Sequence, residues 1–169
     1  IEVLLTNEMI DEYLMPVIAK YNDLDIVHVE KAEIETKDED DGIDETIKQG
    51  FISRLKTILE EKVEDIKSSN RLIGSPCSLV SGSGSMNAHM EQMMRMMDPN
   101  FKEGKKVMEI NFSHGLIKKM VEHYQTDPDS DGFKKMAETL YDAMLVLDEK
   151  LDNPTILVEN LYHYMEKAN

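Results

Sequence analysis

A strongly acidic segment at residues 30–45 limits the fold of this chain more than any other feature of its sequence. The segment holds nine Asp or Glu residues and two Lys residues, which gives −7 of the formal net charge of −15. Like charges at this density repel one another, and almost no side chain there can join a core. We therefore expect a mobile linker between a small α/β piece at residues 1–29 and a larger domain at residues 46–169.

Composition excludes several classes of function. The acidic balance opposes binding to nucleic acid, because phosphate groups need a basic surface. No apolar run approaches the roughly 20 residues of a transmembrane helix, so we expect no membrane contact. A single cysteine, Cys77, leaves no internal disulfide and is typical of a reducing compartment such as the cytoplasm. The chain starts inside an expected strand and without Met, so we expect a piece of a longer protein.

The spacing of apolar residues predicts an α+β fold, with a small mixed sheet and several helices. We expect strands at residues 1–5, 26–29, 63–67, 77–81 and 107–110. We expect helices at residues 8–21, 43–59, 86–97, 113–125, 132–149 and 154–167. The last two helices form a pair at the C-terminal end.

The expected helix at residues 86–97 is unusually rich in methionine. Its methionines would cover more than one helical face, and they are Met86, Met90, Met93, Met94, Met96 and Met97. Met is unbranched and polarizable, so such a surface can adapt to many partners. A buried core helix is the alternative interpretation, and the spacing alone favours it. The Gly/Ser-rich loop at residues 81–85 and the break at residues 98–100 favour exposure instead.

The two C-terminal helices each carry an apolar stripe, and residues 152–154 supply the turn between them. The stripes include Leu140, Met144 and Leu147 on the first helix and Leu157, Leu161 and Tyr164 on the second. One helix pair cannot bury both stripes by itself. The stripes therefore pack on the domain body, or they pair with a second copy as an intermolecular four-helix bundle in a C2 homodimer.

Residues 127–138 fit the ligand pattern of a calcium-binding loop, with Asp127, Asp129, Asp131 and Glu138 at the ligand positions. A single EF-hand-like calcium-binding module is therefore an alternative function. Lys134 stands where such loops have an apolar residue, and the stiff Pro128 occupies the second position. The other interpretation is a turn whose aspartates cap the following helix. We expect no metal ion here.

No arrangement of residues in the sequence predicts catalysis. Cys77, His89, His114 and His123 lack the tight spacing of a zinc site, and His114 is expected to cap a helix. No Gly-rich phosphate loop or nucleophile elbow is present. We therefore expect no catalytic residue, and we expect that this piece is not an enzyme.

Several stretches together resemble the heat shock protein 90 family, in its bacterial form. Residues 71–80 (RLIGSPCSLV) resemble a family signature in which Arg-Leu precedes Ser-Pro and an apolar strand. Residues 86–94 (MNAHMEQMM) resemble the amphipathic helix that follows it. Residues 109–117 (EINFSHGLI) resemble a third stretch, with Phe112 and Gly115 in place of two usual prolines. Upstream, residues 2–5 and 7–15 resemble the end of the family's middle domain.

This resemblance implies a molecular chaperone that assists protein folding in the stress response and uses ATP with magnesium. In that family the N-terminal domain binds ATP and the middle domain completes hydrolysis. The C-terminal domain holds two protomers together through its last helices. The family's nucleotide-binding sequence is absent here, so the resemblance implies a C-terminal piece that needs no cofactor of its own. Its end lacks the acidic tail of eukaryotic cytosolic members.

The resemblance also implies which residues touch unfolded or partly folded client proteins. These are Glu12 and Tyr13 from the middle-domain piece, and Met86, Met90, Met93 and Met94 from the amphipathic helix. The methionine pattern and the resemblance agree, and together they favour an exposed helix over a buried one.

Overall fold

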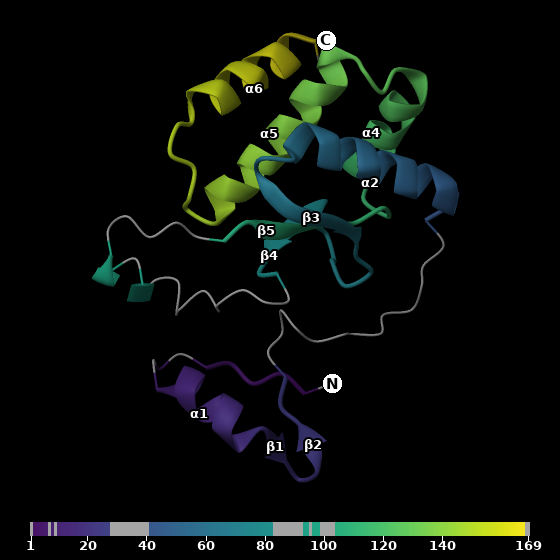
Figure 1. Cartoon of the computed structure of the whole chain (residues 1–169). Helices are drawn as coiled ribbons and strands as arrows, with labels where there is room; N and C mark the ends of the chain where they lie inside the picture. Colours follow the sequence, from purple (N-terminus) through teal and green to yellow (C-terminus); the bar gives the residue numbers. More distant parts are fainter. Residues whose placement is uncertain are drawn as a thin grey trace. The chain divides into compact units, whose positions relative to one another are not determined.

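The computed structural model describes residues 2–6, 8, 10–27, 41–82, 93–94, 96–98 and 104–167, without the side chains of Glu12, Tyr13 and Pro16. The chain divides into two compact units, Ile1–Ile34 and Glu35–Asn169. Both units contain helices and strands (Figure 1), which confirms the α+β fold class.

The first unit is a short helix followed by a β-hairpin. Helix α1 spans Asp11–Ile18, and the antiparallel strands β1 and β2 span Lys20–Tyr21 and Leu24–Asp25. The turn residues Asn22 and Asp23 have φ values of 48° and 63°. A two-residue type I′ turn requires positive φ at both positions, and Asn and Asp tolerate it well.

Three of the secondary-structure predictions differ from what the first unit shows. The strand expected at residues 1–5 is wrong for the described residues 2–5, which have no regular secondary structure and carry exposed Val3, Leu4 and Leu5. A strand needs a hydrogen-bonded neighbour, and apolar content does not supply one. The helix expected at residues 8–21 is shorter, because the backbone leaves the helix at Ala19 with a φ of 52°. The strands lie at residues 20–25, before the expected residues 26–29, of which 28 and 29 lie outside the described residues.

A three-stranded mixed sheet forms the base of the second unit. Its strands are β3 (Val63–Ser68), β4 (Cys77–Val80) and β5 (Lys106–Ile110). Strand β5 lies in the middle, parallel to β3 and antiparallel to β4. The expected mixed sheet is confirmed, and each of these strands agrees with its prediction to within about a residue.

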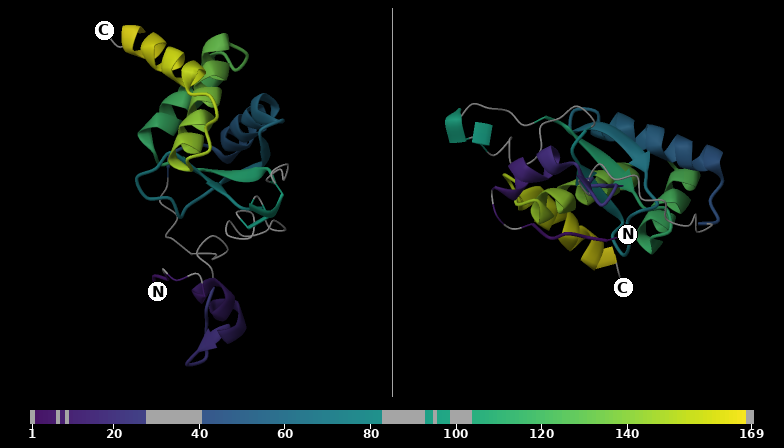
Figure 2. Two further views of the ribbon diagram at one scale, coloured as in Figure 1. Left: turned by 90° about the vertical axis from the view of Figure 1, so that its left-hand side faces the viewer. Right: turned by 90° about the horizontal axis from the view of Figure 1, so that it is seen from below.

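Helices lie on one side of this sheet, and the last of them packs on the helix before it rather than on the sheet (Figures 1 and 2). They are α2 (Glu45–Leu59), α4 (Gly115–Thr126), α5 (Asp131–Leu147) and α6 (Thr155–Lys167). Side chains cap three of the N-termini: Asp44 accepts a hydrogen bond from the Thr46 amide, His114 from the Leu116 amide and Ser130 from the Phe133 amide. Such caps satisfy amides that have no partner within the helix.

The core of the second unit is built around Phe51 of α2. Its ring meets the rings of Phe112, Tyr124 and Phe133 edge to face, each with a centroid separation of 5.8 Å. Edge-to-face pairs at this separation add to the stability that burial alone provides. The core continues along α2 through Leu55 and Leu59, and it includes Ile66, Met108 and Ile110 of the sheet.

Replacing Phe51 with Ala should lower the free energy of unfolding by about 3–5 kcal/mol, because it removes a fully buried ring from three aromatic contacts. Urea unfolding of the chain would measure this loss. Ile73 is 92% exposed, so its replacement with Ala is a matched control that should change the free energy by less than about 0.5 kcal/mol. Equal effects of the two substitutions would contradict this core.

Candidate functional site

Helix α6 packs lightly against α5 with one of its faces. Leu157, Asn160 and Tyr164 lie at helical spacing on that face and are partly buried. The side-chain amide of Asn160 donates a hydrogen bond of 3.0 Å to the Thr139 hydroxyl of α5. No residue of α6 is buried. A 13-residue helix is marginal in water by itself, so this light packing calls for a further partner.

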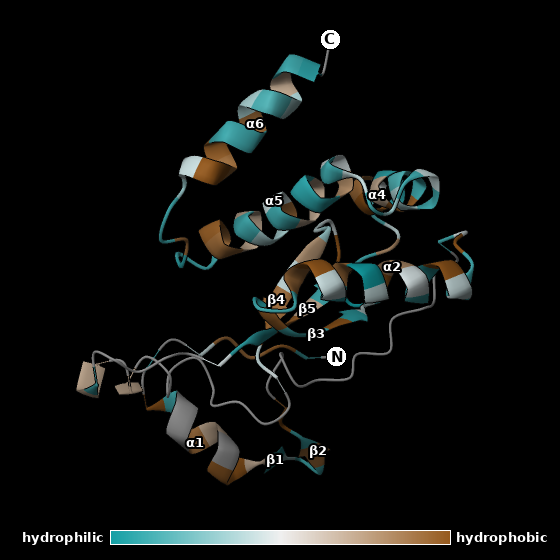
Figure 3. Ribbon diagram, turned by 45° about the horizontal axis from the view of Figure 1, so that its top comes forward, coloured by the Kyte–Doolittle hydropathy of each residue, from teal (hydrophilic) through white to brown (hydrophobic). Residues whose placement is uncertain are grey.

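A neighbouring face of α6, turned about a third of the way round the helix from the α5-facing side, carries a second apolar stripe, which we call the outer stripe. It consists of Val158, Leu161, Tyr162 and Met165, and all four side chains are exposed. These positions follow the i, i+3, i+4, i+7 spacing of one helical face. Figure 3 shows hydrophobic segments along α6. A helix with apolar residues on both faces normally lies between two neighbours.

The structure separates the residues expected at a dimer interface into three groups. Leu140 and Met144 lie in the core of their own chain, so they are not available to a partner. Leu157 and Tyr164 lie on the α5-facing side of α6, and burial raises the pKa of the Tyr164 phenol. Only Leu147 and Leu161 are exposed. Helical spacing identified the apolar positions but could not tell which of two faces meets the domain body.

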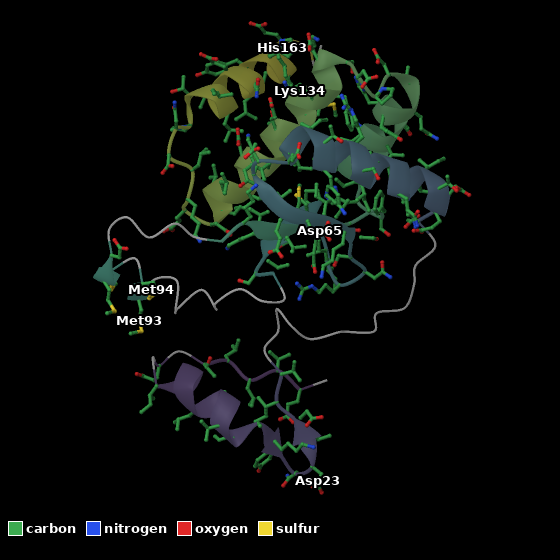
Figure 4. The ribbon with its side chains drawn as sticks, viewed as in Figure 1. Asp23, Asp65, Met93, Met94, Lys134 and His163 are labelled. Carbon is green, nitrogen blue, oxygen red and sulfur yellow. The ribbon has the colours of Figure 1, made fainter. Side chains whose placement is uncertain are left out.

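A second exposed apolar surface is the methionine segment, by which we mean Met93, Met94, Met96 and Met97. Residues 93–94 and 96–97 are helical, and the Asp98 amide donates to the carbonyl of Met94. All four side chains are exposed, and Met93 and Met94 are labelled in Figure 4. The expected client residues Met86 and Met90 lie outside the described residues.

Glu12 and Tyr13 lie within α1, at its second and third positions. Their side chains are outside the described part of the structure. The two units carry the expected client residues on separate parts of the chain, α1 in the first and the methionine segment in the second.

The residues of the calcium-like pattern do not converge. Asp127 accepts a hydrogen bond from the Asp129 amide, and Asp129 forms an ion pair of 3.0 Å with Arg54 of α2. Arg54 also donates to the Pro128 carbonyl. Helix α5 begins at Asp131, so Glu138 lies about 10 Å further along the helix axis. Arg54 thus holds this turn, and only the tertiary structure reveals that role.

Among the described residues, no group of three or more His, Cys, Asp or Glu side chains is arranged so that it could hold a metal ion. Burial raises the pKa of the Cys77 thiol to about 12, which keeps it protonated and opposes a role as nucleophile. His114 caps α4 as expected. Among the described helices, none has the length and apolar character needed to cross a membrane.

Two buried polar residues near the end of β5 anchor the loop between β3 and β4. Glu109 accepts hydrogen bonds from Arg71 (2.7 Å) and from the Ser69 hydroxyl (3.0 Å). The side-chain amide of Asn111 donates to the carbonyls of Leu72 and Ser75. Residues 71–80 and 109–117, which carry the resemblance described above, therefore meet in one hydrogen-bond network.

The comparisons with known proteins agree with that resemblance. A family model described as Hsp90 protein matches residues 1–169. The chain belongs to the Hsp90 protein family, as the sequence predicted.

Curated relatives are similar over nearly the whole chain. The chaperone protein HtpG of Oleidesulfovibrio alaskensis is 34% identical over 180 residues, and HtpG of Chlorobium luteolum is 32% identical over 172. Heat shock protein 90-6, mitochondrial, of Arabidopsis thaliana is 31% identical over 178 residues. Each alignment covers 99% of this chain but only 28%, 28% and 22% of the relative. The chain thus spans about 28% of the length of the HtpG relatives.

Addition of calcium should leave the melting temperature unchanged, because Arg54 already neutralises Asp129 and Glu138 is remote from the aspartates. Differential scanning calorimetry with millimolar calcium, and with a chelator as the control, would measure this. A ligand that binds the folded state at a hundred times its Kd would stabilise the fold by about 2.7 kcal/mol. A rise of several degrees would therefore support the calcium-binding alternative.

Proposed function

We propose that this chain is the C-terminal dimerisation and client-contact region of an ATP-dependent molecular chaperone of the Hsp90 family. Residues 1–29 would be the end of the middle domain, residues 30–45 an acidic linker and residues 46–169 the dimerisation domain. The outer stripe of α6 is the observation that carries the proposal. It is an apolar helical face without a partner among the described residues.

A second copy of the chain is the partner that suits this stripe. Two α5–α6 pairs related by a two-fold axis would form a four-helix bundle, in which each outer stripe meets the other chain. A stable contact of this kind needs about 800 Å² from each partner. Leu147 near the end of α5 and Ile156 at the start of α6 extend the exposed apolar surface beyond the stripe.

The methionine segment is the proposed contact for client proteins. Its side chains are exposed and adaptable, which suits unfolded or partly folded chains of varied sequence. Met86, Met90, Glu12 and Tyr13 join this contact in the proposal, on the strength of the resemblance. In a dimer, two linked copies of a weak site raise the effective concentration for a client that touches both.

ATP and magnesium belong to the remainder of the protein in this proposal, and this region itself carries no catalytic residue. Its partners are a second copy of itself and client proteins, and its proposed location is the cytoplasm. The HtpG relatives come from bacteria, and the Arabidopsis relative is described as mitochondrial.

Sedimentation equilibrium should show a dimer of the chain at micromolar concentration. Replacing both Leu161 and Met165 with Ser should weaken it by roughly 100-fold, because each protomer loses two apolar contacts. Leu116 of α4 is similarly exposed, so L116S is a matched control that should leave the dimer intact. A wild-type chain that stays monomeric, or a double variant that dimerises normally, would contradict the proposed interface.

Replacing both Met93 and Met94 with Ser should lower affinity for a permanently unfolded protein by about tenfold. Fluorescence anisotropy with a labelled, reduced and alkylated client would measure it. Unfolding free energy should change little, since exposed side chains contribute little to it. A loss of several kcal/mol of stability would mean that these methionines are packed in a core, and unchanged client affinity would remove them from the contact.

A further inference from the structure

Among the described residues, some methionines are buried and others are largely exposed to solvent. Met108, Met120 and Met144 are buried in the core of the second unit. Met96 and Met97 are 76% and 77% exposed, which makes them the most exposed methionines in the part of the chain that the structure describes. A solvent-borne oxidant therefore meets the sulfur atoms of the methionine segment well before those of the core.

The one thiol group that could compete for such an oxidant is not accessible to solvent. Cys77 is the single cysteine of the sequence, and it is buried between the sheet and the helices. Peroxides react with thiolates, and burial keeps this thiol protonated by raising its pKa to about 12. Oxygen transfer to this chain should consequently fall on exposed thioethers.

We propose that Met96 and Met97 form a peroxide-sensitive modification site, and that their oxidation to methionine sulfoxide weakens the contact with client proteins. The second half rests on the proposed function of the methionine segment. Each sulfur takes one oxygen atom from hydrogen peroxide: the O–O bond breaks, an S–O bond forms and the other oxygen leaves as water. Sulfur loses two electrons and peroxide gains them.

Oxidation changes the property on which the client contact depends. A thioether is apolar and adaptable, whereas a sulfoxide is polar and keeps water at the surface. The fold is unaffected, because the core methionines are sealed from solvent and the modified side chains make little contribution to stability. A methionine sulfoxide reductase with a thiol reductant reverses the change. The modification therefore acts on binding and leaves the domain folded.

The oxidation rate of Met165 distinguishes a specific site at Met96 and Met97 from general oxidation of surface methionines. Its side chain is 69% exposed in a single chain, yet it belongs to the outer stripe that the proposed dimer covers. In the dimer, Met165 should oxidise more slowly than Met96 and Met97. In L161S, which leaves Met165 in place, diluted until sedimentation shows a monomer, all three should oxidise at comparable rates.

The test combines peptide mass spectrometry with client binding on the same samples. The 169-residue chain is treated with hydrogen peroxide over a time course, and sulfoxide is mapped at each methionine. Met96 and Met97 should be modified first, while Met108 and Met120 stay unmodified. Affinity for the unfolded client should fall by about tenfold as the two sites are oxidised, and a reductase should restore it.

Two variants make the result decisive. In M96L/M97L these two side chains remain apolar but cannot be oxidised. Its client affinity should therefore change by less than twofold, relative to its own untreated sample, at the peroxide exposure that oxidises Met96 and Met97 of the wild-type chain but not the less exposed Met93 and Met94. M96Q/M97Q imitates the polar sulfoxide and should bind weakly before any treatment. A loss on peroxide treatment that is as large in M96L/M97L as in the wild-type chain would overturn the assignment.

The outcomes keep the two proposals apart. Oxidation of Met108 as early as Met96 would overturn the modification site, whatever the client data show. Failure of the untreated chain to bind any unfolded client would overturn the proposed function, together with the effect of oxidation on clients. The order in which the methionines oxidise is measured without a client, so the proposed modification site is tested independently of client binding.

Discussion

The packing of Phe51 against three aromatic rings is the interaction on which the second unit depends. The ring belongs to α2, and its neighbours come from the segment after β5, from α4 and from α5. Helix α2 is thereby joined to three later parts of the chain from which it is distant in sequence. With α2, α4 and α5 committed to this core, α6 is left outside it with no buried residue. The exposed outer stripe is thus a direct consequence of how the core is filled.

Two of the stretches that carry the family resemblance, residues 71–80 and 109–117, have a common structural role. Arg71 and Glu109 form a charge-assisted hydrogen bond, and Asn111 holds the carbonyls of the same loop. Lys67 lies 3.6 Å from the other oxygen of Glu109. A buried carboxylate is costly without such partners, so each stretch requires the other. Their pairing explains in physical terms why Arg-Leu near one strand and Glu-x-Asn at another occur together in this chain.

The two exposed apolar surfaces suit different kinds of partner. The outer stripe is a regular helical face in which three of the four side chains are branched or aromatic, which favours a fixed, complementary neighbour such as a second copy. The methionine segment offers unbranched side chains with many accessible conformations, which favours weak contact with varied sequences. In the proposed function, the outer stripe would hold two chains together while the methionine segment binds clients reversibly. The net charge of −15 favours specific over nonspecific contacts, because repulsion between chains opposes random self-association through the apolar surfaces.

The sequence by itself determined the α+β class, the family, strands β3, β4 and β5, and helices α2, α4, α5 and α6 to within a few residues. These features follow from local periodicity, capping residues and short motifs, all of which a single stretch of chain contains. Tertiary structure decided which apolar side chains are buried. Leu140 and Met144 face the core and Leu161 faces solvent, although all three lie on regular apolar stripes. It also decided that Arg54 of α2 binds the calcium-like turn and that residues 2–5 form no strand. Burial and pairing depend on residues that are distant along the chain, and a local sequence pattern does not specify which distant residues will make the contact.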